Sequence, residues 1–105
     1  MQVILIFTTV SGEYEAVKIS EALIGERLIA CANFFPMKSR YWWKEKLEQA
    51  SEVLMILKTL QEKYEAVEKR IRELHSYETP EIIAVEIESG YAPYLHWIEK
   101  TVKKN

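Results

Sequence analysis

The order of strand-like and helix-like segments constrains this chain more than any other feature. The apolar run Val3–Phe7 has the composition of a buried strand. In segment 12–27, apolar residues recur at helical spacing. A β-rich stretch then extends from residue 28 to 43, and another is centred on residues 53–57. These segments predict a β-α-β-β order for the first 60 residues.

The second half of the sequence adds a helix, a strand and a final helix. Thr59-x-x-Glu62 matches a capping box, and the helix that follows has one apolar stripe, formed by Tyr64, Val67, Ile71 and Leu74. After a loop over 75–80, Ile82–Ile87 reads as a fourth strand. The last helix is predicted after Gly90, with an apolar face of Tyr91, Tyr94, Leu95, Ile98 and Val102. The complete order predicts an α+β, ferredoxin-like βαββαβ sandwich with an extra C-terminal helix, as a single domain over 1–105.

Residues at the element boundaries refine this prediction. Ser11 is a candidate N-cap for the first helix. Pro36 marks a bulge or an edge strand, because it cannot donate a ladder hydrogen bond. Residues 44–46 predict a tight turn between two strands that each exceed ten residues, compared with about five or six in most proteins. Strands of this length would project beyond the sheet.

The predicted strands are apolar on both faces. In the first strand, Leu5 and Phe7 point one way while Ile4 and Ile6 point the other. A strand with one face in water should alternate apolar and polar residues. Leaving a second apolar face in water would forfeit ~1.5–3 kcal/mol for each side chain. The C-terminal helix could cover part of that face, and we expect a partner subunit to cover the rest. The alternative is a monomer whose termini fold over it.

The composition excludes several classes of protein. The 16 acidic and 14 basic residues give a net charge of −2, which argues against a nucleic-acid-binding protein. Segment 1–10 lacks a basic leader and is too short to cross a bilayer. A single cysteine, Cys31, suggests a reducing compartment. We therefore expect a cytoplasmic protein with neither nucleic acid nor membrane as partner.

Few side chains are candidates for chemistry, and no catalytic or cofactor motif is present. His75 could bind a metal or exchange protons, or it could simply favour the dipole at a helix C-terminus. Cys31 in an apolar strand is better read as a buried, inert thiol. His96 is expected on the surface. Lys58-Thr59 could hold an anion, or Thr59 could cap the next helix. We therefore predict no catalytic residues and no enzyme.

Several segments together resemble the CutA divalent-cation-tolerance family. They are Glu26–Asn33, Tyr41-Trp42-Trp43, Glu52–Thr59, Leu74-His75-x-Tyr77-Glu78-x-Pro80-Glu81-Ile82 and Tyr94-Leu95-x-Trp97. They occur in the family's order across nearly the whole chain. The resemblance implies a ferredoxin-like subunit that assembles into a homotrimer through its sheets, and a link to tolerance of copper and other divalent metals.

The resemblance also implies a cleft between subunits. Its expected metal ligands are His75, Cys31 and Glu52, and its other ligand-binding residues are Trp43, Lys58 and Tyr77. The chain departs from the family at Glu45, where the hairpin turn usually carries Gly, and at Ser76, where Pro usually follows the histidine. Phe7 and Leu74 replace a Cys and a His that the family's copper ligand set includes. With one imidazole left, the implied binding of Cu(II) or another divalent cation is weak.

Three functions follow as hypotheses. The first is a non-enzymatic trimer that binds divalent cations weakly in the interface cleft and takes part in the response to metal ions. The second is a regulatory trimer, similar to the PII signalling proteins, that holds a small anionic metabolite through Lys58, Tyr77 and Trp43. The third is a small enzyme with Glu52 or His75 as a base, which no nucleophile or cofactor motif supports.

Overall fold

The computed structural model describes residues 1–104, and its element order confirms the predicted α+β, ferredoxin-like arrangement. Its elements are β1 (Val3–Val10), α1 (Glu13–Gly25), β2 (Cys31–Trp43), β3 (Lys46–Leu60), the 3₁₀ turn η1 (Gln61–Lys63), α2 (Tyr64–Leu74), β4 (Ile83–Glu86) and α3 (Ala92–Lys103). The four strands form one antiparallel sheet in the order β2-β3-β1-β4. Strand β3 therefore lies between β1 and β2, and β1 lies between β3 and β4, which is the ferredoxin-like topology that the sequence predicts.

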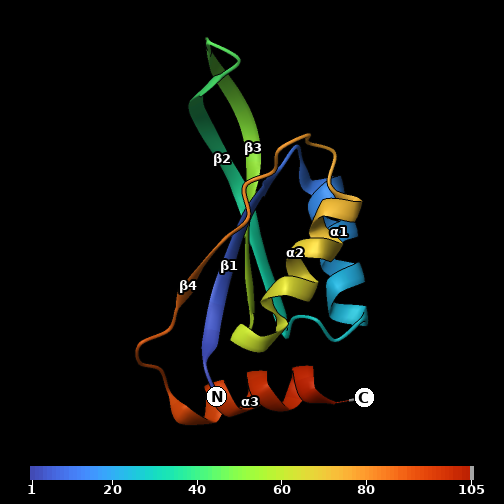
Figure 1. Cartoon of the computed structure of the whole chain (residues 1–105), viewed down its shortest axis with the longest axis vertical. Helices are drawn as coiled ribbons and strands as arrows, with labels where there is room; N and C mark the ends of the chain where they lie inside the picture. Colours follow the sequence, from blue (N-terminus) through green and yellow to red (C-terminus); the bar gives the residue numbers. More distant parts are fainter. Residues whose placement is uncertain (105) are drawn as a thin grey trace.

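Helices α1 and α2 cover one face of the sheet (Figure 1). We call it the closed face. Alternate residues of β1 and β3 point into it, and Ile6 and Leu57 are fully buried there. They pack with Ile19 of α1 and Ile71 of α2, both also fully buried. Because strand residues alternate between faces, the next residues along each strand point to the other side of the sheet.

The opposite face, which we call the open face, is covered only at one end. Helix α3 crosses below the sheet in Figure 1, where Ile98 packs against Val3 and Leu60. Beyond α3, Phe35, Ile83 and Val85 are 46%, 53% and 45% exposed. The structure therefore bears out the apolar character of both faces, and within residues 1–104 α3 supplies only part of the cover.

The β2–β3 hairpin projects past the rest of the sheet as a long arm (Figure 1). Its pairing runs without interruption from Cys31 opposite Lys58 to Trp43 opposite Lys46. Pro36 therefore lies on an edge strand, as predicted, and no bulge accompanies it. At the tip, Lys44 and Glu45 have φ angles of 51° and 65°, the left-handed values that a two-residue hairpin turn requires.

Both predicted helix caps are wrong. The N-cap of α1 is Gly12 in extended conformation, and the Ser11 hydroxyl donates instead to the Glu15 carboxylate at 2.8 Å. Thr59 lies inside β3, where its hydroxyl donates to the carbonyl oxygen of Leu28 at 2.7 Å. The Ser11 hydroxyl therefore bonds to a carboxylate in the first turn of the same helix, and only the Thr59 hydroxyl bonds to an acceptor far away in sequence.

The other differences concern boundaries and exposure. Helix α1 is shorter at both ends than the predicted 12–27, and β4 is shorter than the predicted Ile82–Ile87. On the last helix, Ile98 and Val102 are buried as predicted. Tyr91 and Tyr94, also assigned to the apolar face, are 77% and 41% exposed because α3 meets the sheet along a narrower stripe.

Candidate functional site

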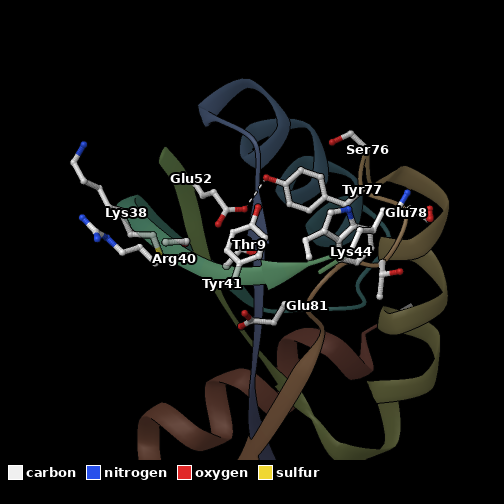
Figure 2. Close-up of a pocket in the computed structure, with 14 residues that line it drawn as sticks. Thr9, Lys38, Arg40, Tyr41, Lys44, Glu52, Ser76, Tyr77, Glu78 and Glu81 are labelled. Carbon is white, nitrogen blue, oxygen red and sulfur yellow. Dashed lines mark hydrogen bonds between the residues drawn. The ribbon is translucent and has the colours of Figure 1, made fainter. Parts of the chain in front are cut away.

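A cleft of ≈ 890 Å³ lies between the hairpin arm and the segment that follows α2 (Figure 2). Its lining residues come from four parts of the chain: Thr9 at the end of β1, residues 37–41 with Trp43 and Lys44 on the arm, Glu52 on β3, and residues 76–79 with Glu81. Both signs of charge are present. Lys38 and Arg40 extend outward on one side of Glu52, and Tyr77 lies on its other side (Figure 2).

Tyr77 and Glu52 meet at the centre of this cleft. The Tyr77 hydroxyl donates a hydrogen bond of 2.7 Å to Oε2 of Glu52, whose residue is only 6% exposed. Burial, and then the hydrogen bond to Glu52, raise the pKa of Tyr77 above its ordinary value of 10.0. The phenol therefore keeps its proton at neutral pH and occupies one oxygen of Glu52. The second oxygen is available to another donor or to a cation.

His75 lies directly behind Tyr77 at the C-terminal end of α2, and its side chain is fully buried. Its Nε2 lies 2.8 Å from the carbonyl oxygen of Thr9, and its Nδ1 lies 3.0 Å from the backbone nitrogen of Tyr77. A carbonyl accepts and an N–H donates, so these partners assign the proton to Nε2 and the lone pair to Nδ1. Both ring nitrogens are engaged, and a metal could bind His75 only by displacing one partner.

Cys31 and Lys58 face each other on β2 and β3, at the other end of the sheet. Lys58 is six residues from Glu52 along β3, a distance of roughly 20 Å in an extended strand. Its Nζ lies 3.2 Å from the Tyr94 hydroxyl and 5.5 Å from the centroid of that ring. Cys31 is half-buried rather than buried as predicted, with Sγ 3.6 Å from Oδ1 of Asn33.

Within one chain, the six predicted site residues therefore lie in two separate groups. Glu52, Tyr77 and Trp43 line the cleft with His75 behind them, whereas Cys31 and Lys58 lie near α3. Within residues 1–104, no three His, Cys or Glu side chains come together as a metal-binding group. The predicted ligands His75, Cys31 and Glu52 could share a metal only if a second subunit contributed to the site.

The sequence reasoning missed Glu15, the most extensively hydrogen-bonded side chain near the cleft. Its carboxylate accepts hydrogen bonds from the backbone and the hydroxyl of both Ser11 and Ser76. A sequence signal did exist: Glu15 is spaced four residues from Ile19 and eight from Leu23, so it continues the apolar stripe of α1. A carboxylate on such a stripe must be paired or hydrogen-bonded.

Comparison with known proteins identifies the family. The model of the CutA1 divalent ion tolerance protein family matches residues 4–101. This chain belongs to that family. It is 43% identical to the divalent-cation tolerance protein CutA of Archaeoglobus fulgidus over 98 residues, which cover 93% of this chain and 96% of the relative. It is 41% identical to mouse protein CutA over 92% of this chain and 55% of the relative.

Solved structures of family members agree with the fold. The structure of the A. fulgidus protein, described as a periplasmic divalent cation tolerance protein, matches with a TM-score of 0.94 at 42% identity, covering 95% of this chain and 98% of that one. A variant of CutA1 from Pyrococcus horikoshii matches with a TM-score of 0.93 at 40% identity, covering 96% of this chain and 99% of that one. The family is named for tolerance of divalent ions and not for a catalysed reaction.

The predicted cytoplasmic location stays a prediction. One family member is described as periplasmic, and a rice relative is described as chloroplastic, so relatives occur in different compartments. No helix within residues 1–104 combines the length and hydropathy needed to cross a membrane.

Proposed function

We propose that this CutA1-family chain acts in divalent-cation tolerance without catalysing a reaction, as a homotrimer that binds cations weakly in the cleft around Glu52. Membership of the family supports the biological role. The observation that carries the site is the buried Glu52 carboxylate, which has one oxygen held by Tyr77 and lies on a cleft open to solvent. A carboxylate with a free oxygen is a ligand for divalent cations.

The exposed part of the open face supports association with other subunits, and the number three comes from the family resemblance. Phe35 on β2, and Ile83 and Val85 on β4, are exposed apolar side chains that do not belong to the cluster around α3. The arm adds exposed Tyr41 and Trp43 on the same face of β2, at the edge of the sheet. Such areas are usually covered by other subunits.

The geometry favours weak binding of Cu(II). Copper prefers imidazole and thiolate over carboxylate alone, but both His75 nitrogens have partners and Cys31 lies at the other end of the sheet. Tight binding would require His75 to release the Tyr77 backbone or the Thr9 carbonyl, and a second subunit to supply Cys31. We therefore expect one weak site per cleft, in which Glu52 is the principal ligand.

Isothermal titration calorimetry with Cu(II) tests this proposal. Glu52→Gln keeps the shape of the side chain but removes its charge, and we expect a loss of affinity of about tenfold or more. His75→Ala should also weaken binding if the imidazole is recruited. His96→Ala is the matched control, because His96 is exposed on α3 and away from the cleft. If Glu52→Gln binds Cu(II) as the unsubstituted chain does, the cleft is not the metal site.

The hypothesis of a site for an anionic metabolite is not carried forward. Within one chain the three residues that it required do not meet, because Lys58 is paired with Tyr94 at the other end of the sheet from Tyr77. The charged side chains that line the cleft also balance, with Lys38, Arg40 and Lys44 beside Glu52, Glu78 and Glu81, so they do not select an anion.

A further inference from the structure

The carboxylate of Glu15 joins two segments that are far apart in sequence. It accepts hydrogen bonds from the backbone nitrogen and hydroxyl of Ser11, at 3.0 and 2.8 Å, just before α1. It also accepts from the backbone nitrogen and hydroxyl of Ser76, at 2.7 and 3.0 Å, just after α2. Four donors match the acceptor capacity of one carboxylate. Glu15 therefore fastens the segment after α2 to the first turn of α1.

This carboxylate remains charged although its residue is only 8% exposed. Burial would raise its pKa, but the hydrogen bonds from Ser11 and Ser76 outweigh that effect and lower the pKa from 4.5 to about 2. Capping of α1 alone would need only the Ser11 bonds. The two bonds from Ser76 act on the segment that carries Tyr77.

The segment held by Glu15 leads directly into the cleft. Ser76 is followed by Tyr77, whose backbone nitrogen donates to Nδ1 of His75 and whose hydroxyl donates to Glu52. His75 is fixed in turn by the carbonyl oxygen of Thr9. A continuous chain of hydrogen bonds and one peptide linkage therefore connects Glu15 to Glu52. Glu15 itself does not line the cleft.

We infer that Glu15 is a positioning residue for the cleft: it holds Ser76 so that the hydroxyl of Tyr77 rests on Glu52. The geometry does not depend on what the cleft binds. The further consequence, that Glu15 influences cation affinity through Tyr77, rests on the proposed function. The positioning of Tyr77 and its influence on cation affinity can be tested separately, by one measurement on the segment and another on metal binding.

The first measurement is amide hydrogen exchange at residues 76–78. Glu15→Gln keeps the size of the side chain but turns an NH₂ group toward N–H and O–H donors, so at least one of the four bonds is lost. We expect exchange at these amides to be about tenfold faster or more, since hydrogen bonds to a charged group are strong. Amides in the centre of β1 and β3 should keep their relative protection.

Glu13→Gln is the matched control, because Glu13 is exposed in the same helical turn and has no partner in this cluster. Ser76→Ala is a milder variant that removes one of the four donors, and it replaces Glu15→Gln if that variant fails to fold. The inference is wrong if the amides of residues 76–78 exchange in the folded Glu15→Gln variant, or in its substitute Ser76→Ala, at the same rate as in Glu13→Gln.

The second measurement is Cu(II) affinity in a double-mutant cycle with Tyr77→Phe. If Glu15 acts through Tyr77, Glu15→Gln weakens Cu(II) binding about tenfold in the unsubstituted chain and has little further effect in the Tyr77→Phe background. Equal losses in both backgrounds would mean a general structural role and would contradict the positioning role. Faster exchange with unchanged Cu(II) affinity would retain the positioning of Tyr77 and reject its influence on metal binding, while Glu52→Gln decides separately whether the cleft is the metal site.

Discussion

The two faces of the sheet are built from alternate residues of the same strands, yet they have different surroundings. On β3, Leu57 points to the closed face and is fully buried, whereas its neighbour Ile56 points to the open face and is only partly covered. Both are large aliphatic residues. The amino-acid sequence therefore makes both faces apolar, and the layers packed on each face determine which of these residues lose contact with water.

Leu57→Ala should produce the largest effect, because it removes a side chain from the closed face. We expect the free energy of unfolding to fall by ~2–5 kcal/mol, since a buried Leu loses its transfer energy and leaves a cavity. Urea unfolding monitored by circular dichroism measures this loss. The mass of the native assembly, from sedimentation, should stay as it is. A loss below ~1 kcal/mol would mean that the closed face is not the main core.

Val85→Glu should act on assembly and not on the fold of the subunit. Val85 is 45% exposed on the open face, so a charge there is solvated in a single chain but buried in an interface. We expect the loss of valine burial alone to cost ~1.5–3 kcal/mol at each interface. Sedimentation should show a smaller species with an unchanged far-ultraviolet spectrum.

Glu86→Gln provides the control for this substitution. Glu86 is the next residue of β4 and pairs with Ile4, so its side chain points away from the open face. If the Val85→Glu chain keeps the mass of the unsubstituted assembly, a surface other than the open face holds the subunits together.

Acid should weaken the attachment of α1 to the segment after α2. The pKa of Glu15 is lowered from 4.5 to about 2, so its contribution is fully present above pH 4.5 and is lost as the pH falls from 4.5 toward 2. We expect ~1.5–3 kcal/mol of stability to be lost over this range. Urea midpoints from pH 6 to pH 2 measure it. In Glu15→Gln, the fall of the urea midpoint between pH 4.5 and pH 2 should be smaller by this contribution. If the midpoint falls as steeply as in the unsubstituted chain, other carboxylates cause the acid sensitivity.

Glu45→Gly should produce the smallest effect, and it should be stabilising. Glu45 has a φ of 65° at the tip of the arm, a conformation that costs a side-chain-bearing residue ~1 kcal/mol and costs glycine little. We expect a gain of ~1 kcal/mol in urea unfolding. Glu48→Gly is the matched control, because Glu48 lies within β3 and glycine weakens strand interiors. A loss of stability in both variants would contradict the turn geometry.

Much of the fold could be predicted because periodicity reports directly on packing. The apolar stripe of α2 and the apolar run Val3–Phe7 both appear in the structure as expected. The two caps failed for different reasons: the Ser11 hydroxyl bonds to Glu15 one helical turn away, whereas the Thr59 hydroxyl bonds to the Leu28 carbonyl, which only folding brings close. A hydroxyl bonds to the nearest well-placed acceptor in space, and local sequence cannot rank acceptors that only folding brings close.

The candidate site was predictable as a set of residues but not as an arrangement. The family resemblance pointed to His75, Tyr77 and Glu52, and the structure places these together. It also pointed to Cys31 and Lys58, which the strand register places at the other end of β3. Glu15 escaped notice because a helix-terminal Glu usually lies in solvent. Its place on the apolar stripe of α1 signals burial, but only the folded chain shows Ser76 beside it.

The order of strands and helices and the apolar character of both sheet faces can be read from the amino-acid sequence alone. Both follow from which residues recur at the periods of a strand or a helix, and these periods are properties of the backbone. The packing of the folded chain is needed to show that one face is buried while Phe35, Ile83 and Val85 on the other stay exposed. It also shows that Glu15 holds the segment carrying Tyr77. Burial and hydrogen bonding between distant segments depend on distances that exist only in the folded chain.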